Sequence, residues 1–171
     1  QHIARSIKSA EQISKKIYIV DSFSTDKTLD IAKSFNVNVV QNKFINYSKQ
    51  YEWALNNLKL ESSWIMRLDA DEFLEDDLIN EIKMKLPSIS KNIVGINFKR
   101  KHIFMDKWIR FGGRYPLILL RLWRNGFGTI EDRWMDEHII VKNGETTTFK
   151  NSFVDHNLND LVFFKKKHKN Y

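Results

Sequence analysis

Three short apolar segments, each followed by a polar turn and a helical pattern, constrain the fold of this chain more than any other feature. The segments are residues 17–20, 37–40 and 64–68, and apolar residues recur after each of them at three- and four-residue spacing. This spacing is typical of amphipathic helices. Because strands that alternate with helices usually pair in parallel, the first half of the chain predicts an α/β fold with a mostly parallel sheet.

The pattern changes near residue 90. Beyond this point, alternating apolar and polar residues and glycine-containing loops predict a β-rich half, which ends in a helical pattern that begins at Leu158. The strand candidates in this half are residues 94–98, 118–123, 138–142 and 146–150. No segment rich in proline, glycine or serine separates the two halves. We therefore expect one domain of residues 1–171, built from the halves 1–90 and 91–171.

The composition narrows the classes of function. The 171 residues include 28 Lys and Arg against 21 Asp and Glu, a net charge of +7, which favours anionic partners such as nucleotide phosphates, nucleic acid or a membrane surface. Cysteine is absent, which excludes disulfide scaffolds, thiol chemistry and cysteine zinc sites. The longest apolar run, residues 117–120, is far too short to span a bilayer. We expect a basic protein of the cytoplasm.

Acidic side chains follow the first and third apolar segments. Asp21 comes after the first, and Asp69 and Asp71 come after the third. In an open α/β sheet, ligands bind beyond the carboxyl ends of the strands. Two aspartates one residue apart in a turn can hold one Mg²⁺ or Mn²⁺ together with substrate phosphates. The alternative is that the acidic run 69–77 simply favours the N-terminus of the next helix, and these residues alone leave both interpretations open.

An ordered set of motifs resembles glycosyltransferase family 2. Residues 20–26 (VDSFSTD) and 64–72 (WIMRLDADE) are similar to the two acidic motifs of the family. Residues 47–55, 120–124 and 136–138 resemble its intervening helix, its late "LRLF-R" strand and its late acidic segment. The resemblance covers nearly the whole chain. It implies a GT-A fold and inversion at the anomeric centre, with the bacterial enzymes of lipopolysaccharide core, O-antigen or capsule synthesis as the nearest branch.

The resemblance also implies roles for individual residues. It places Asp71, with Asp69, at a Mg²⁺ or Mn²⁺ ion that bridges the donor diphosphate, because the negative charge on the nucleoside diphosphate leaving group needs stabilisation. Residues 1–90 would bind the nucleotide-sugar donor, a UDP-sugar by preference, and residues 91–171 would bind the acceptor. The residues implied at the donor are Asp21, Ser22, Lys49, Asp69 and Arg121.

An inverting displacement needs a carboxylate that takes the proton from the acceptor hydroxyl. Glu137 matches the recurring glutamate of the late acidic segment, so we expect it to be the base, with Asp136 as the second candidate. Without the resemblance, the preferred interpretation of this pair of acids is a solvated turn before the strand candidate 138–142.

The remaining candidates concern the acceptor and the membrane. Residues 99–114 are rich in Lys, Arg and His and predict a basic loop over an anionic donor or acceptor. Phe163 and Phe164 precede a lysine-rich segment, residues 165–169, which predicts contact with anionic lipid at the inner face of the membrane. Such contact suits a glycan or lipid-linked acceptor. His138 and His156 are candidates for a third metal ligand.

One departure from the family pattern and two alternatives accompany this interpretation. Members of the family normally begin with a strand, whereas residues 1–10 resemble the helix after it, so we expect the first strand to be absent and both ends to be truncated. The first alternative is a haloacid-dehalogenase-like phosphotransferase with Asp69 as nucleophile, although Phe73 stands where such sites want a small or β-branched residue. The second is a non-catalytic basic module. No nucleic-acid motif occurs, so we expect no nucleic-acid partner.

Overall fold

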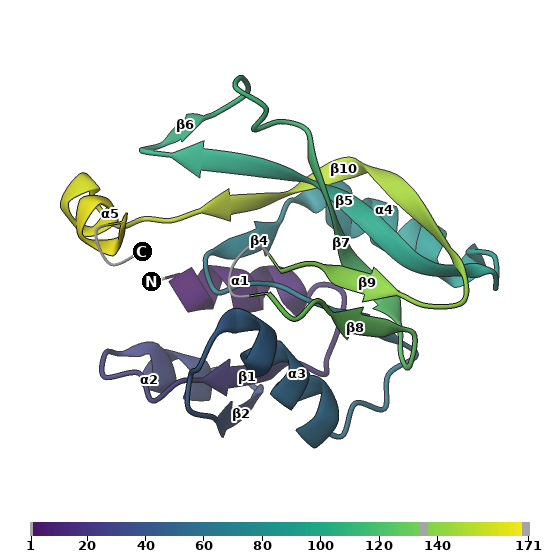
Figure 1. The fold of residues 1–171 in the computed structure, drawn as a ribbon, viewed down its shortest axis with the longest axis horizontal. Helices are drawn as coiled ribbons and strands as arrows, with labels where there is room; N and C mark the ends of the chain where they lie inside the picture. The colour runs from purple at the N-terminus through teal and green to yellow at the C-terminus, as the bar shows by residue number, and fades with distance from the viewer. Residues whose placement is uncertain (1, 134–136, 169–171) are drawn as a thin grey trace.

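The computed structural model describes residues 2–133 and 137–168 (Figure 1). The helices are α1 (His2–Ala10), α2 (Thr28–Lys33), α3 (Tyr47–Asn57), α4 (Asp76–Lys85), the 3₁₀ turn η1 (Leu86–Ser88) and α5 (Leu161–His168). The first strands are β1 (Tyr18–Asp21), β2 (Asn38–Gln41), β3 (Trp64–Met66), β4 (Glu72–Leu74) and β5 (Ile93–Phe104). The later strands are β6 (Lys107–Trp108), β7 (Leu117–Arg124), β8 (Gly128–Ile130), β9 (Ile139–Val141) and β10 (Glu145–His156). The described residues therefore form an α/β chain whose second half is rich in strands, as the sequence predicts.

In the described part of the chain the strands pair into three sheets, and the central sheet contains both parallel and antiparallel pairs. A central sheet has the order β3-β7-β5-β10-β4, β6 pairs with β5, and the pairs β1-β2 and β8-β9 form small sheets. The pairs β1-β2 and β5-β10 are parallel, but the other pairs are antiparallel, so the expectation of mostly parallel pairing is wrong for the central sheet. The physical reason is that parallel neighbours need a long crossover, usually a helix, and no helix separates β5 from β7.

The core lies between α4 and one face of the central sheet. Leu78 and Ile82 of α4 pack with Phe98 of β5 and with Phe149 and Phe153 of β10. All five side chains are buried. Because α4 belongs to the first half of the chain and β5 and β10 to the second, both halves share one core. The division into halves 1–90 and 91–171 stays a prediction.

Strand β4 is the element that sequence patterns missed, and it positions the site. The acidic run 69–77 does not lead straight into a helix, because Glu72 lies in β4 opposite Asp155 of β10. Helix α4 begins only at Asp76, with Asp76 and Asp77 in its first turn, where their charge favours the helix N-terminus. The acidic run therefore divides into buried residues of a sheet and exposed residues of a helix.

Candidate functional site

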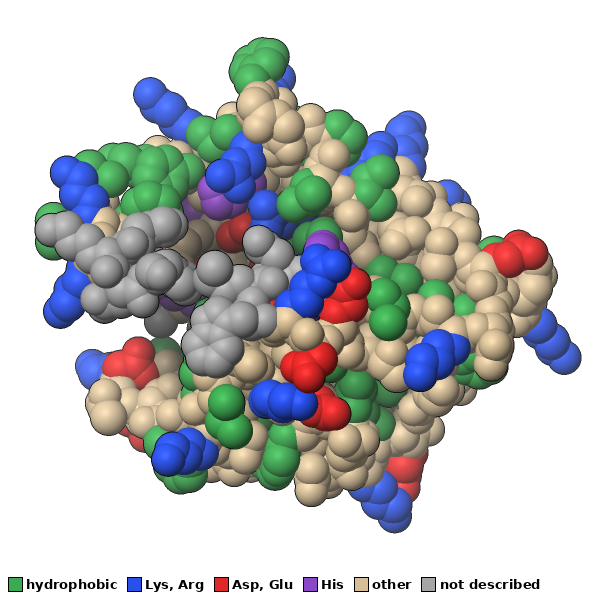
Figure 2. All heavy atoms as spheres, in the orientation of Figure 1, with side chains coloured by type: hydrophobic (Ala, Val, Ile, Leu, Met, Phe, Trp, Pro, Cys, Tyr) green, Lys and Arg blue, Asp and Glu red, His purple; other side chains and the backbone are tan. Residues whose placement is uncertain are grey.

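A cavity of about 1230 Å³ lies where α1, β1, α3, β3 and β7 approach one another. Acidic and histidine side chains lie deep in this face of the molecule, behind lysine and arginine side chains (Figure 2). The sequence-predicted site residues that line the cavity are Ser22, Asp69, Asp71, Arg121 and Glu137. The structure therefore brings together residues from both halves of the chain.

Asp69 has three partners that favour its ionised form. The Tyr51 hydroxyl donates to its Oδ1, Arg67 Nε lies 3.3 Å from the same oxygen, and Arg121 Nη2 lies 3.8 Å from Oδ2. Although burial opposes ionisation, the two guanidinium groups and the hydroxyl hold the pKa of Asp69 below its ordinary value. Asp69 is therefore a fixed negative charge at the wall of the cavity.

Glu72 lies directly behind Asp69. It is 3% exposed, its Oε2 accepts from the Asp69 backbone N–H at 2.9 Å, and its Oε1 accepts from Arg121 Nη2. Burial raises the pKa of Glu72 to about 8, and the negative charges of Asp69 and Asp155 add to the rise against the opposing effect of Arg121. Glu72 fixes both the Asp69 backbone and the Arg121 guanidinium.

Asp71 has fewer protein partners than Asp69. Its Oδ2 accepts a hydrogen bond from Asn157 Nδ2 at 3.0 Å, and its backbone oxygen accepts from His156 N at the same distance. No ion pair to Asp71 occurs among residues 2–133 and 137–168. Its carboxylate, which lines the cavity, is therefore the one with most capacity left for a cation.

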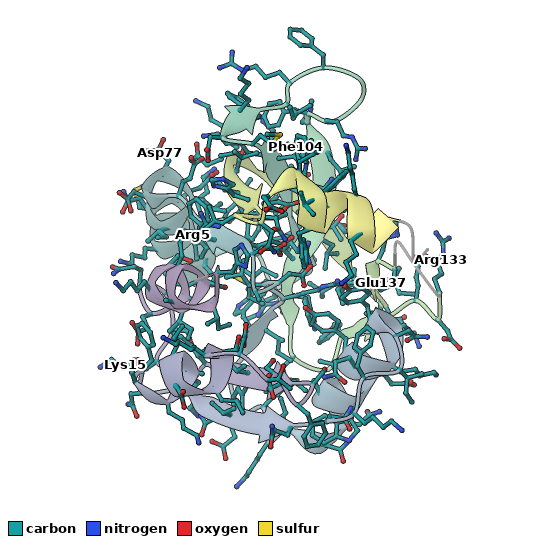
Figure 3. The ribbon with its side chains drawn as sticks, turned by 90° about the vertical axis from the view of Figure 1, so that its left-hand side faces the viewer. Arg5, Lys15, Asp77, Phe104, Arg133 and Glu137 are labelled. Carbon is teal, nitrogen blue, oxygen red and sulfur yellow. The ribbon has the colours of Figure 1, made fainter. Side chains whose placement is uncertain are left out.

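Glu137 is held by a buried arginine. Arg67 Nη2 donates to Glu137 Oε1 at 2.6 Å, and the two side chains are 7% and 6% exposed. The Arg67 guanidinium also stacks 4.0 Å from the centre of the Tyr51 ring. In Figure 3, Glu137 lies between α5 and α3. This contact holds the Glu137 carboxylate beside Arg67, which also contacts Asp69. Asp136, the second candidate base, lies outside the described residues.

Asp21 and Lys49 do not join this group. Asp21 is 4% exposed, and its Oδ2 accepts from Ser24 N at 3.1 Å and from Gln41 Nε2 at 3.0 Å. Although burial opposes ionisation, these hydrogen bonds hold the pKa of Asp21 below its ordinary value. Its neighbour Ser22 does line the cavity. Lys49 lies outside it, where its ammonium pairs with Glu52 at 2.9 Å and with Asp132 at 3.7 Å.

The carboxylate oxygens of this site suit a hard cation whose other ligands are water and substrate phosphates. Asp71 and Asp69 offer carboxylate oxygens, which Mg²⁺ and Mn²⁺ prefer. Within the described part of the chain, no three Asp, Glu, His or Cys side chains gather closely enough to hold a metal by themselves. His138 and His156 are already paired with Glu131 and Asp106. Because Mg²⁺ usually keeps several waters and binds substrate phosphates, one or two aspartates fit it.

The chain is similar to known proteins over most of its length. The profile of the family described as Glycosyl transferase family 2 matches residues 1–157. The chain belongs to glycosyltransferase family 2.

Two relatives and one solved structure are also similar to parts of this chain. Uncharacterized glycosyltransferases of Rickettsia bellii and Rickettsia prowazekii are 40% and 35% identical to this chain over 81 residues. That stretch is 47% of this chain and 27% of each relative, so the chain matches about a quarter of their length. The crystal structure of Staphylococcus aureus TarS 1-349 is similar with a TM-score of 0.62 at 12% identity, over 90% of this chain and 56% of that one. This likeness shows the fold and confirms the expected α/β, GT-A class.

Within this family 2 domain, sequence reasoning missed three residues of the site. The sequence patterns assign no role to Tyr51 or Arg67, and they include Glu72 only in the acidic run 69–77 before a helix. One signal was present: Arg67 stands between two apolar residues at the end of a buried segment, where an unpaired charge is costly. Such an arginine predicts nearby carboxylates, and the structure supplies Asp69 and Glu137.

Proposed function

We propose that this chain carries the catalytic site of a metal-dependent, inverting glycosyltransferase that uses a nucleoside diphosphate sugar. One observation carries the proposal: a single cavity is lined by the aspartate pair Asp69 and Asp71, the arginine Arg121 and the carboxylate Glu137. Transfer from such a donor needs a cation site, positive charge for a diphosphate and a base for the acceptor. Family membership supports the same conclusion.

Asp71 and Asp69 would hold Mg²⁺ or Mn²⁺. When bound, the ion supplies a Lewis acid that stabilises negative charge on the departing diphosphate. Arg121 adds a fixed positive charge at the same wall, because Glu72 orients its guanidinium. Since Arg121 and Asp69 are already locked by their neighbours, little reorganisation is needed when the diphosphate leaves.

Glu137 is the base in this proposal. Its pairing with Arg67 fixes the position of its carboxylate, and a carboxylate in the cavity can accept a proton from a sugar hydroxyl. Because Arg67 donates to Glu137 Oε1, the acceptor hydroxyl has to compete with Arg67 for the carboxylate. Glu137→Gln should therefore abolish transfer but leave donor binding intact. Loss of transfer in Asp136→Asn, together with an active Glu137→Gln variant, would reassign the base to Asp136.

The acceptor is a glycan or a lipid-linked glycan in the synthesis of a cell-surface polysaccharide, following the resemblance. Contact with the inner face of the membrane is part of this proposal. Val162, Phe163 and Phe164 of α5 are 73%, 47% and 40% exposed, and Lys165 and Lys166 follow them. Exposed apolar side chains beside lysines favour binding to anionic lipid. Among the described helices none is long and apolar enough to cross a membrane.

Thermal unfolding with and without donor nucleotide tests this function. UDP, GDP or dTDP with Mn²⁺ should raise the melting temperature, because a ligand that binds only the folded state stabilises it. Asp71→Asn should abolish the rise. Asp76→Asn is the matched control, since Asp76 is exposed in the first turn of α4 and does not line the cavity. A wild-type protein that shows no metal-dependent rise with any of these nucleotides would contradict the proposal.

A further inference from the structure

The basic residues of β5 lie on opposite faces of the central sheet. Side chains alternate along a strand, so Arg100 and His102 share one face and Lys99 and Lys101 share the other. Arg100 and His102 line the large cavity, whereas Lys99 and Lys101 line a separate cavity of about 330 Å³. The basic loop expected over the site is therefore divided, and only part of its charge reaches the cavity.

Arg100 has fewer partners than its burial requires. Its side chain is 19% exposed, and its one ion pair is from Nη1 to Asp155 Oδ2 at 3.5 Å, which is longer than an ordinary hydrogen bond. Arg100 Nε is buried without a hydrogen-bond partner among the described residues. A guanidinium has five N–H donors, and donors left unsatisfied in a buried place are costly. An anion in the cavity would satisfy the remaining donors.

His102 shares the same carboxylate. Its Nδ1 lies 3.1 Å from Asp155 Oδ2, which leaves Nε2 without a partner in the described part of the chain. Asp155 therefore balances at most one of its two basic neighbours. Arg114 also lines the cavity, is exposed, and has no ion pair within residues 2–133 and 137–168. It lies in the loop that leads to Leu117, the residue of β7 that pairs with Arg100. This end of the cavity carries more positive than negative charge.

Aromatic rings border these cations. The Phe104 ring lies 5.0 Å from the Phe164 ring of α5, and both side chains line the cavity beside Phe163. Figure 3 shows Phe104 at the start of α5. Aromatic rings beside cations suit a ligand that has an apolar or sugar face next to an anionic group. Free inorganic ions would use only the cations.

The strand order separates this region from the aspartates. β10 lies between β4, which carries Glu72, and β5, which carries Arg100 and His102. Two strand spacings amount to about 10 Å. Arg121 is on β7, the other neighbour of β5, but Arg100 pairs with Leu117 of β7, which is four residues or about 13 Å along the strand from Arg121. An anion at Arg100 therefore lies beside the donor diphosphate site proposed at Asp71 and Arg121.

We propose that Arg100, His102 and Arg114 form an oxyanion subsite for the acceptor, so that the accepting glycan carries a phosphate or a carboxylate. This inference rests on the proposed function, because it names the acceptor class of the same cavity. The shared chemistry is an oxyanion that accepts hydrogen bonds from a guanidinium, and such charge-assisted bonds are among the strongest in proteins.

Calorimetric titration of the 171-residue chain with four probes tests the subsite: inorganic phosphate, glucose 6-phosphate, glucuronate and glucose. The anionic sugars should bind, and glucose should not bind at the same concentrations. Arg100→Gln should weaken anion binding about tenfold or more, because it removes charge-assisted hydrogen bonds. Lys101→Gln, which removes the same charge from the other face of β5, should change it less than about twofold. If Arg100→Gln fails to fold, the exposed Arg114→Gln should give a loss of about threefold.

The outcomes separate this inference from the proposed function. Tighter glucose 6-phosphate than glucuronate supports a phosphorylated acceptor, and the reverse order supports an acidic sugar. Equal binding of glucose and the anions, or wild-type anion binding in both arginine variants, would overturn the inference. The melting-temperature rise with nucleotide and Mn²⁺ is measured on the same proteins. If that rise is absent while arginine-dependent anion binding remains, the proposed function fails and the anion site stands.

Discussion

Two regions of the cavity handle charge in opposite ways. The acidic floor consists of Asp69, Glu72 and Glu137 with the arginines Arg67 and Arg121, and each carboxylate has a guanidinium partner. At the basic end, Arg100 and His102 share Asp155, and Arg114 has no ion pair within the described residues. Arg121 Nε and Arg100 Nε are both buried without a hydrogen-bond partner among the described residues, so the two regions differ in the balance of their charges and not in complete satisfaction of their donors. Charges that are paired inside a network hold one another in place, whereas an excess of positive charge retains capacity to bind an anion.

Removing an arginine from the acidic floor should have the largest effect on stability. Arg121→Leu removes a buried guanidinium from the ionised Asp69 and a hydrogen-bond donor from the buried Glu72, and removal of one partner of a buried ion pair typically costs about 3–5 kcal/mol. The free energy of unfolding in urea at pH 8 measures this loss. Arg100→Gln is the matched variant at the basic end and should cost about 1 kcal/mol or less. Equal losses would show that the two regions do not differ.

The pKa of Glu72 predicts how the floor responds to pH. The folded protein keeps a proton on Glu72 up to about pH 8, whereas the unfolded chain releases it near pH 4.5. Folding therefore takes up a proton in this window, so the contribution of Glu72 is fully present below pH 4.5 and is lost as the pH rises through 8. As the pH rises from 4.5 to 8, the unfolding free energy of the wild type should therefore fall relative to that of Glu72→Gln, by at most about 1.4 kcal/mol per pH unit.

Unfolding free energies of both proteins at pH 5, 6.5 and 8 measure this difference. Glu81→Gln is the control with the opposite sign, because hydrogen bonds from Lys85 and from the backbone of Lys150 and Asn151 hold the pKa of Glu81 below its ordinary value despite burial. Its contribution is complete above pH 4.5, so its difference from wild type should stay constant over this range. A constant difference for Glu72→Gln as well would refute the raised pKa.

Tyr51→Phe tests a single hydrogen bond of the floor. Burial, with the nearby charge of Asp69, raises the pKa of Tyr51 well above its ordinary value, so the phenol stays protonated and donates to Asp69. Phenylalanine keeps the ring under Arg67 and removes only the hydroxyl, which should cost about 1 kcal/mol in unfolding free energy. Tyr18→Phe removes an exposed hydroxyl that donates to the Lys59 carbonyl and should cost less. The opposite ranking would argue against an ordered floor.

The sequence predicted most elements of the fold because hydrophobic periodicity is a local signal. It placed β1, β2, α3 and α4 within a few residues of their observed bounds. It missed β4, since three residues inside an acidic run carry no periodicity, and their strand exists only because β10 pairs with them. It also missed the direction of strand pairing in the central sheet. Strand direction depends on contacts between distant segments, which a local pattern does not contain.

The same limit applies to the site. Asp69, Asp71 and Glu137 were found because acids after an apolar segment, or in a family motif, are visible in the sequence. The pairing of Arg67 with Glu137 joins residues seventy positions apart. The buried position of Arg67 predicts that carboxylates lie nearby, but no local sequence pattern identifies Glu137 as one of them. Family resemblance is a weaker guide for a single side chain, because a helix can match a motif while one of its residues faces outward.

Lys49 is such a residue, and it gives the smallest expected effect. The resemblance assigned it to the donor, but its ammonium is exposed, pairs with Glu52 and Asp132, and does not line the cavity. Those acidic partners raise the pKa of Lys49, so it stays charged in neutral solution. Lys49→Gln removes only surface pairs, which contribute little to stability, and should change the unfolding free energy less than any of the variants above. It should also leave the melting-temperature rise with nucleotide and Mn²⁺ intact, unlike Asp71→Asn. If Lys49→Gln abolished that rise, the donor would have to reach beyond the cavity to the outer face of α3, and the floor would no longer define the donor site alone.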